Sequence, residues 1–219
     1  MCTLSKKDQQ LLGSLRVCPV HETKHPDFPE HIPRSGQRVF VPLRLMECFH
    51  TLKEQGGNVV ELNPGHTIEQ IARTKIGAIY QATSLPEHAP RYYSCSTFTF
   101  WVFSCIGMRL PRYAIDQSYI GQLLTRPSRP GLAFYQNRFP IRDSDRAIGH
   151  VGITTREGTI IHGSVQAGRI LEEPIPEHAV LFTDPFPLEP HMLLIIPKKI
   201  KGIETALDLA RWLARPLRT

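Results

Sequence analysis

The pattern of hydrophobic and polar positions changes along the chain, from helical spacing in the first half to short strand-like runs in the second. In residues 43–55 and again in residues 67–83, apolar side chains recur three and four positions apart, which predicts two helices that each bury one face. The first predicted helix ends at Gly56-Gly57, and a short strand over residues 59–62 follows. Thr67 is placed to cap the second helix. The buried stripe expected for that helix is Ile68, Ile71, Ala72 and Ile76.

Residues 92–107, YYSCSTFTFWVFSCIG, predict a third helix whose first turn is polar and whose remainder is apolar. Ser94 is the expected N-cap, and Gly107 and Pro111 terminate the helix. Because the apolar side chains recur at helical spacing, we expect this helix to be the central one of the domain. Those side chains are Phe98, Trp101, Val102, Cys105 and Ile106.

Downstream of Pro130-Gly131 the predicted elements are strands. Five short segments are rich in β-branched or aromatic residues and are separated by turn residues, so they predict a meander of antiparallel strands. These segments are LAFYQ (132–136), HVGITT (150–155), TIIHGS (159–164), AVLF (179–182) and MLLIIP (192–197). A final helix is expected at about 203–214. Helices followed by strands predict an α+β domain, in which the Cys95 helix packs on an antiparallel sheet of about five strands.

The length of 219 residues suits one substantial domain with extensions. Residues 1–40 are rich in proline, histidine and charge, which predicts an irregular N-terminal arm. Residues 41–66 form a helical N-terminal extension in this interpretation, and residues 67–219 form the main domain with its C-terminal helix.

The composition, 41% hydrophobic and 21% charged, is ordinary for a folded protein, and 19 prolines indicate many connecting loops. The formal net charge of +6 favours anionic surroundings, but no stripe of aromatic and basic residues indicates nucleic-acid recognition, so we expect solvated surface charge. Five irregularly spaced cysteines argue against a disulfide framework and predict mostly reduced thiols.

The N-terminus lacks the apolar run of about 7 to 15 residues expected of a signal peptide, and no stretch reaches the ~18 apolar residues of a membrane span. The sequence as given therefore predicts a soluble chain, either cytoplasmic or exported by a non-standard route. Cys18, His21, His25 and His31 match no zinc-ligand spacing, so we expect surface histidines in a loop there. The oligomeric state is left open.

Cys95 lies where the field of a helix N-terminus lowers the pKa of a thiol, which a cysteine nucleophile requires. A lone cysteine on an apolar helix is usually core, and Cys105 fits that description. Cys95 fits it less well, because small hydroxyl residues surround it in the first turn. They are Ser94, Ser96, Thr97 and Thr99.

A cysteine nucleophile also needs a base, and His150 and His162 are the candidates. If residues 156–158 form a three-residue hairpin loop, Thr155 pairs with Thr159 and the two histidines become diagonal neighbours on one face of adjacent strands. A two-residue loop would place the histidines on opposite faces. The loop length therefore decides whether the two histidines can act together. A histidine within a strand is also often structural, with its ring nitrogens bonded to backbone groups.

These motifs together resemble the NlpC family of cell-wall cysteine peptidases over roughly residues 68–165. The family combines a cysteine at a helix start, a Pro-Gly strand entry, an H-V-G-I strand and a strand ending in I-H. The matching stretches are Ser94-Cys95-Ser96-Thr97, Leu110-Pro111-Arg112, Pro130-Gly131-Leu132, His150-Val151-Gly152-Ile153 and Ile161-His162-Gly163-Ser164.

The resemblance implies a papain-like core in which Cys95 is the nucleophile, His150 the base and His162 the polar residue that orients the base. Gly77-Ala78-Ile79-Tyr80 resembles an upstream aromatic segment of the family, so Tyr80 is a candidate substrate-side or oxyanion residue. Ser94 stands where the family usually has aspartate, near the peptide-binding end of the cleft. Thr97 likewise stands where the family has glycine. Besides Tyr80, the candidate substrate-binding residues are Ser94 and Ser96.

The sequence thus predicts a cysteine hydrolase that cleaves amide bonds, with peptides or fragments of peptidoglycan as candidate substrates and without metal or cofactor. Three alternatives remain open. In the first, the protein is a catalytically inactive binding module of the same fold. In the second, it transfers the acyl group to an acceptor other than water. In the third, Cys95, His150 and His162 bind zinc.

Overall fold

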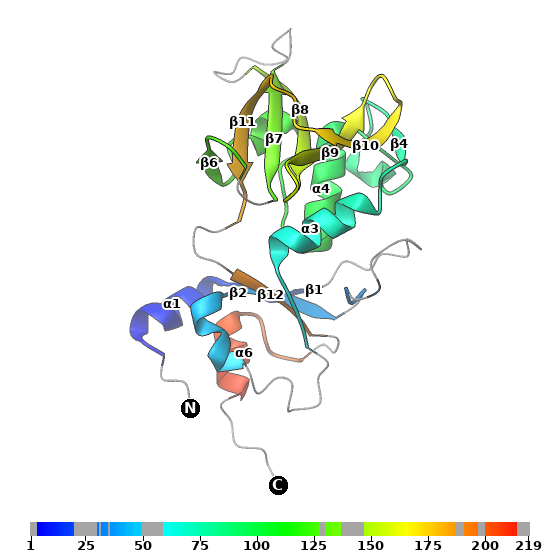
Figure 1. Ribbon diagram of the computed structural model, residues 1–219. Coiled ribbons are helices and arrows are strands. Elements are labelled where there is room, and N and C mark those ends of the chain that lie inside the picture. Colours follow the sequence, from blue (N-terminus) through cyan, green and yellow to red (C-terminus); the bar gives the residue numbers. More distant parts are fainter. Residues whose placement is uncertain are drawn as a thin grey trace. The chain divides into compact units, whose positions relative to one another are not determined.

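The computed structural model describes residues 4–19, 30, 32–34, 36–49, 59–127, 130–136, 147–186, 191–196 and 200–213 (Figure 1). The chain divides into two compact units. We call one the terminal unit, because it takes in residues 1–24, 30–64 and 189–219, from both ends of the chain. The other is the central unit, residues 25–29 and 65–188.

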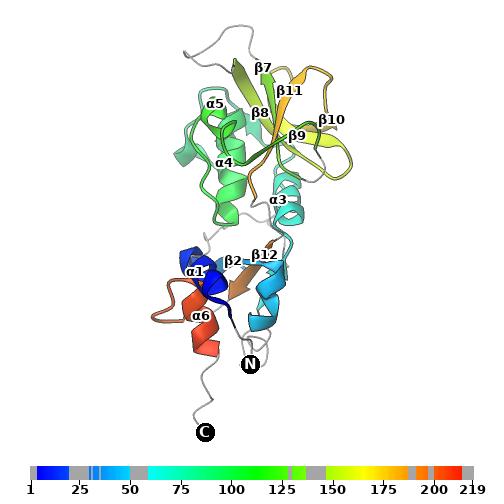
Figure 2. The same ribbon diagram turned by 90° about the vertical axis from the view of Figure 1, so that its left-hand side faces the viewer.

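The terminal unit is built on a four-stranded antiparallel sheet in the order β1-β2-β12-β3. The strands are β1 (Cys18–Pro19), β2 (Gln37–Pro42), β3 (Val60–Leu62) and β12 (His191–Ile196). The helices are α1 (Lys6–Ser14), the 3-10 helix η1 (Leu43–Phe49) and α6 (Ala206–Leu213), and α1 and α6 pack together as Figure 2 shows. Apolar side chains from all of these helices and from the sheet share one core.

The predicted division of the chain differs from this one at its C-terminal end. The MLLIIP segment, expected in the main sheet, is β12, which pairs with β2 and β3 instead. The final helix forms as predicted, as α6, but it belongs to the terminal unit. Of the expected irregular arm over 1–40, the described residues include α1, β1 and part of β2, and the extension over 41–66 contributes η1 and β3.

The central unit contains an eight-stranded sheet in the order β5-β4-β10-β9-β8-β7-β11-β6, antiparallel except for the pair β4 and β5. Its long strands are β7 (Leu132–Gln136), β8 (Ile148–Thr154), β9 (Thr159–Ser164), β10 (Arg169–Pro174) and β11 (Ala179–Asp184). The short edge strands are β4 (Ile79–Tyr80), β5 (Tyr92–Tyr93) and β6 (Gln122–Leu124). The α+β class is as predicted, with a sheet larger than the five strands expected.

Helix α4 (Cys95–Cys105) packs on β8 and β9, and Figure 2 shows it with α5 (Ala114–Gln117) on one side of the sheet. The prediction of this helix, with Ser94 as its N-cap, is confirmed. The two other helices are α3 (Pro64–Arg73) and the 3-10 helix η2 (Pro86–His88). The start and end predicted for α3 are wrong. Because proline is favoured in a first helical turn, α3 begins at Pro64 instead of being capped by Thr67, and because it ends at Arg73, Ile76 is 47% exposed.

The hairpin between β8 and β9 has the predicted three-residue loop. The amide of Thr155 donates to the carbonyl of Thr159 at 2.9 Å, and Gly158 has a φ of +76°. Further along, Ile153 pairs with Ile161. This register places His162 opposite Gly152 and makes His150 and His162 diagonal neighbours on one face, as required for the proposed base.

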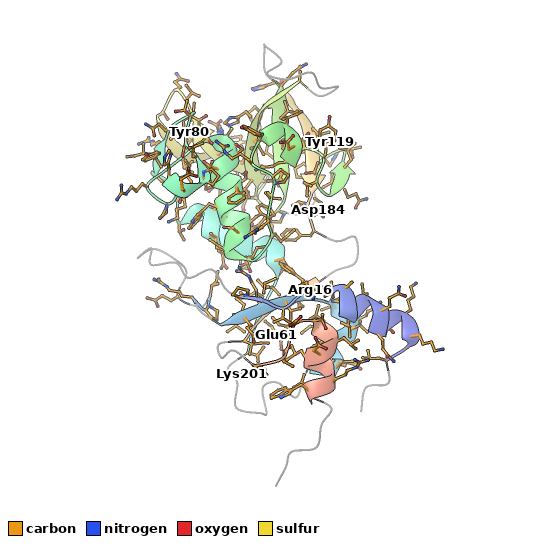
Figure 3. The ribbon with its side chains drawn as sticks, turned by 180° about the vertical axis from the view of Figure 1, so that it is seen from behind. Arg16, Glu61, Tyr80, Tyr119, Asp184 and Lys201 are labelled. Atoms are coloured by element: carbon orange, nitrogen blue, oxygen red, sulfur yellow. The ribbon has the colours of Figure 1, made fainter. Side chains whose placement is uncertain are left out.

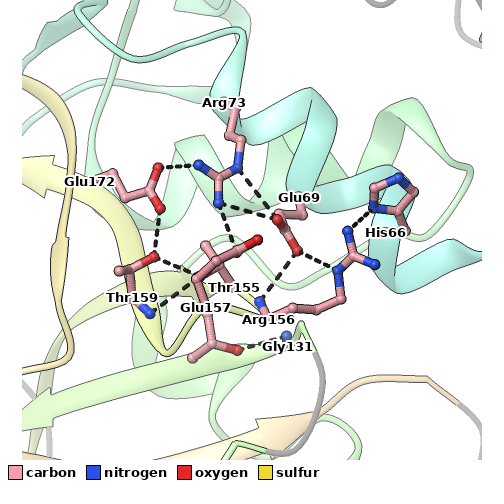
Figure 4. Close-up of polar contacts among 10 residues, drawn as sticks. His66, Glu69, Arg73, Gly131, Thr155, Arg156, Glu157, Thr159 and Glu172 are labelled. Carbon is pink, nitrogen blue, oxygen red and sulfur yellow. Dashed lines mark hydrogen bonds and ion pairs between the residues drawn. The ribbon is translucent and has the colours of Figure 1, made fainter.

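An ionic network holds α3 on this hairpin (Figure 4). Arg73 bonds to Glu69 at 3.2 Å, to Glu157 at 2.9 Å and to Glu172 at 2.6 Å. Glu69, which is nearly fully buried, also accepts from Arg156 at the turn, and Glu172 accepts from Thr159. We call these six residues the Arg73 network, and it bonds α3 to the turn of the β8–β9 hairpin and to β10.

Three of the four cysteines that the structure describes are free, in line with the prediction of mostly reduced thiols. Cys18, Cys95 and Cys105 are free thiols, and Cys48 is disulfide-bonded. Among the residues that the structure describes, no helix is long and apolar enough to cross a membrane. The histidines of the N-terminal cluster, His21, His25 and His31, lie outside the described residues.

Candidate active site

The start of α4 is held by a reciprocal capping box. The hydroxyl of Ser94 accepts a hydrogen bond from the amide of Thr97 at 3.3 Å, and the hydroxyl of Thr97 accepts one from the amide of Ser94 at 2.7 Å. These are the two positions at which the sequence departs from the NlpC pattern. Since each departure satisfies the other's backbone amide, the pair preserves the helix start on which Cys95 is mounted.

The Cys95 thiol is half-buried and lies against the backbone of β8, where it accepts a hydrogen bond from the amide of Val151. Burial raises the pKa of Cys95, and this effect outweighs the opposing hydrogen bonds from backbone amides and the charge of Arg112. The expected lowering of the pKa by the helix start is therefore not the dominant effect. The thiol is neutral at rest and must lose its proton when it reacts.

Ser94 and Ser96, predicted to bind substrate, use their hydroxyls inside the protein. They are 3% and 5% exposed. The Arg112 guanidinium donates to the hydroxyl of Ser96 at 3.0 Å and to the carbonyl of Ser84 at 2.6 Å. This placement favours a supporting role for both serines. The hydrogen bond of Ser96 ties the start of α4 to Arg112 and so keeps a positive charge near the thiol, while the hydroxyl of Ser94 bonds to Thr97 and to the carbonyl of Ser84.

His150 and His162 are in direct contact. Nε2 of His150 lies 2.8 Å from Nδ1 of His162, and the two rings are nearly perpendicular at 86°. Nε2 of His162 in turn lies 2.8 Å from a carboxylate oxygen of Glu173 on β10. A Cβ at Gly152 would fall 2.7 Å from the Cβ of His162, so only glycine leaves room for the second ring. We call His150, His162 and Glu173 the His162 chain.

The rings of the His162 chain are partly shielded from water, since His162 is buried and His150 is half-buried. Tyr135 on β7 lies against both histidines, with ring centroids 5.6 Å from His150 and 6.3 Å from His162. Burial, together with the neighbouring His162, lowers the pKa of His150 to about 4. His150 is therefore neutral near pH 7, and Nε2 is the ring nitrogen that contacts His162.

Tyr80, the candidate substrate-side or oxyanion residue, lies beside the thiol. Its hydroxyl hydrogen-bonds to Cys95. Its ring packs so closely on β9 that a Cβ at Gly163 would fall 2.0 Å from Cδ2 of the tyrosine. Burial raises the pKa of Tyr80 to about 12, together with the negative charge that Cys95 carries once it is deprotonated and with this hydrogen bond, so the phenol stays a hydrogen-bond donor at physiological pH. Figure 3 labels Tyr80 among the side chains of the central unit.

The zinc alternative does not fit this arrangement. Both ring nitrogens of His162 are occupied, one by His150 and one by Glu173, so neither is left for a metal. Within the described part of the chain, no group of three histidine, cysteine, aspartate or glutamate side chains is placed to hold an ion.

A cavity of about 600 Å³ lies elsewhere, in the terminal unit. None of the predicted site residues lines it. Its lining includes Arg16, labelled in Figure 3, and the free thiol residue Cys18.

The sequence did not reveal Glu173 or Tyr135. Glu173 lies in RILEEP, a strand whose glutamates break the apolar run used to recognise strands. The usable signal was the turn-like segment 165–168, because a hairpin closed there pairs Leu171 with His162 and makes Glu173 its diagonal neighbour. Tyr135 lay in a predicted strand, and only the pairing with His150 identifies its position.

The central unit has an α+β order, with a cysteine at the start of a helix that packs on a largely antiparallel sheet. No protein-family model matches the chain, and no curated protein matches it. In structure the chain is similar to NlpC1 from Trichomonas vaginalis, with 20% identity and a TM-score of 0.48 over 56% of this chain and 44% of that one.

Two further solved structures are similar in the same way. An NlpC/P60 family protein from Bacillus cereus has 17% identity and a TM-score of 0.49 over 56% of this chain and 40% of its own. The peptidoglycan hydrolase RipB from Mycobacterium tuberculosis has 18% identity and a TM-score of 0.46 over 57% of this chain and 65% of its own. The chain thus spans less than half of the first two proteins and less than two thirds of the third.

Proposed function

We propose that the protein is a cysteine hydrolase that cleaves amide bonds with Cys95 as nucleophile, His150 as base and His162 as the residue that orients the base. The observation that carries this proposal is the contact of 2.8 Å between the two histidines on β8 and β9. The Cys95 thiol lies near this pair, because it accepts a hydrogen bond from the backbone amide of Val151, the residue after His150. Three separate segments thereby supply a nucleophile, a base and an orienting group, which is the set that nucleophilic catalysis needs.

The protonation states indicate general-base attack. Since the pKa of the thiol is raised and that of His150 is lowered, both groups are neutral at rest. Nδ1 of His150 accepts the thiol proton while the sulfur attacks the carbonyl carbon of the amide. The negative charge that develops on the carbonyl oxygen is stabilised by the backbone amide of Cys95 and by the Tyr80 hydroxyl.

Two proton transfers through His150 complete the cycle. The imidazolium donates its proton to the leaving amine as the C–N bond breaks, which leaves a thioester on Cys95. Water then attacks the thioester carbon and gives a proton to His150. Collapse of this second intermediate releases the carboxylic acid and returns that proton to the thiol, so the resting state is restored.

We further propose stem peptides of peptidoglycan as the substrate class. The support is the resemblance to cell-wall cysteine peptidases. At position 94 no carboxylate is present, and the serine hydroxyl caps α4, so substrate binding here does not depend on an acidic contact at that position.

The test compares Cys95→Ala with Cys105→Ala, a second cysteine of the same helix, on peptidoglycan fragments and on simple peptide amides. We expect hydrolysis to be lost in Cys95→Ala, by a factor of the order of 10⁴ or more, and retained in Cys105→Ala. Hydrolysis that survives in Cys95→Ala would overturn the proposal. Competing amines added to the wild type distinguish acyl transfer from hydrolysis by their products, and an inactive wild type would favour the binding module.

A further inference from the structure

We propose that Glu173 is a positioning residue: through His162, its carboxylate sets the tautomer of both histidines and leaves Nδ1 of His150 free to take the proton of Cys95. This inference rests on the proposed cysteine-hydrolase function, which it extends by one residue. Neither the family resemblance nor the sequence pattern pointed to an acidic residue at this place.

The strand register brings Glu173 to His162. On the β9–β10 ladder, Leu171 is the direct partner of His162, so Glu173, two residues on, is its diagonal neighbour on the same face. His150 is the diagonal neighbour on the other side, from β8. The three side chains therefore lie in one line across three adjacent strands, with both contacts at 2.8 Å.

The direction of the hydrogen bonds follows from the acceptor at the end of this line. A carboxylate only accepts, so Nε2 of His162 must carry a hydrogen and donate it to Glu173. Nδ1 of a neutral His162 is then a lone pair, which accepts from a hydrogen on Nε2 of His150. With its hydrogen on Nε2, a neutral His150 has a lone pair on Nδ1, the form that a general base requires.

The burial of His162 supports a specific contact, although the side chain of Glu173 itself is 43% exposed. The side chain of His162 is 11% exposed, and within the described chain its nitrogens have no partners besides His150 and Glu173. If Glu173 were absent, Nε2 of His162 would lose its acceptor in a largely buried place. The ring would then gain little from keeping its hydrogen on Nε2. The alternative tautomer turns a donor toward Nε2 of His150, so the contact lasts only if His150 moves its own hydrogen to Nδ1, where it can no longer accept the thiol proton.

The neighbouring Glu172 provides a matched control. Successive residues of a strand face opposite sides, and Glu172 bonds to Arg73 and Thr159 in the Arg73 network. Substitution of Glu172 therefore removes a carboxylate from the same strand and leaves the His162 chain intact.

The experiment measures imidazole ¹⁵N shifts by NMR near pH 7 in wild type, Glu173→Met and Glu172→Met, together with kcat and KM for a peptide amide. In wild type and Glu172→Met we expect His150 and His162 to carry hydrogen on Nε2. In Glu173→Met we expect hydrogen on Nδ1 of His162 and a fall in kcat of about 10- to 100-fold with little change in KM.

Unchanged tautomers in Glu173→Met would overturn the inference, as would an equal change in Glu172→Met. Should Glu173→Met not fold, Glu173→Gln and Glu173→Ala are measured in its place. Glu173→Gln keeps an uncharged acceptor for Nε2–H of His162, so a mixture of tautomers there supports the inference. Glu173→Ala has no acceptor, so pure Nε2–H states there contradict the inference. The NMR measurement needs no turnover. If the wild type is inactive but shows the expected tautomers, the proposed function fails while this inference stands.

Discussion

Two adjacent glutamates of β10 take part in two polar clusters with different consequences. Glu172 joins the Arg73 network, in which every charged group meets an opposite charge and the turn of the β8–β9 hairpin is fixed (Figure 4). Glu173 joins the His162 chain, in which the two imidazole rings and the carboxylate follow one another with contacts of 2.8 Å. In the Arg73 network the charged groups are paired with one another, whereas the His162 chain ends at His150, the proposed base.

The comparison shows how strand alternation separates stability from chemistry. Because neighbouring side chains point to opposite faces, one strand supplies a carboxylate to each cluster without bringing the two together. We expect substitutions in the Arg73 network to lower the free energy of unfolding with little effect on the reaction. Substitutions in the His162 chain should do the reverse.

The largest difference is expected between His150 and His66, a histidine bonded to Arg156 at the edge of the Arg73 network. His150→Asn removes the base and should lower kcat/KM by about 10²–10⁴-fold, whereas His66→Asn should leave it within a factor of two or so. The measurement is steady-state hydrolysis of a peptide amide by both variants. Similar losses in the two would show that the clusters are not functionally distinct.

The next effect is the pH dependence of stability. The pKa of His150 is about 4 in the folded protein and 6.5 in its ordinary state, so the unfolded chain takes up the proton first as pH falls. Stability from this group is full above pH 6.5 and is lost as pH falls through 4, by about 3 kcal/mol in all. Urea unfolding at several pH values should show this loss in wild type and not in His150→Asn, and parallel curves would contradict the burial of the ring.

A smaller effect is expected from the Arg73 network. Glu69 is the buried acceptor between Arg73 and Arg156, so Glu69→Gln should lower the free energy of unfolding by about 1–3 kcal/mol, while kcat/KM of the folded enzyme changes little. Urea unfolding in a Trp212→Phe background reports the central unit through Trp101. Glu87→Gln, at an exposed position, is the control, and an equal loss there would remove the special role of Glu69.

The smallest effect concerns the capping box, which supports the nucleophile without belonging to either cluster. Ser94→Ala should cost about 1 kcal/mol, because the amide of Thr97 loses its acceptor. Ser104→Ala, near the other end of α4, should cost less, and the same fluorescence assay compares them. Equal stability of Ser94→Ala and wild type would show that the box is not needed to hold the helix start.

The parts of the site that follow local rules could be predicted. The cap and length of α4 followed from a serine before an apolar helical pattern, and the contact of His150 with His162 followed from the length of one turn. Local rules failed where a signal was ambiguous: Thr67 looked like a cap, but Pro64 begins that helix.

Long-range and polar features were beyond the sequence pattern. An apolar run identifies a strand but does not say which strand it pairs with, so β12 was assigned to the wrong sheet. Strand β10 was missed because its two glutamates interrupt the apolar run that predicts strands, and Glu173 was missed with it. The pKa of Cys95 depends on burial, which a helix start alone does not determine.

The central claim is that Cys95 forms a covalent acyl intermediate with the help of the His162 chain. The direct measurement is mass spectrometry of acid-quenched protein during turnover of an activated amide, followed by mapping of the modified peptide. We predict an acyl thioester on Cys95 in wild type and much slower acylation in His150→Asn. Turnover with no acyl group on Cys95, or acylation of Cys18 or Cys105 instead, would contradict the claim.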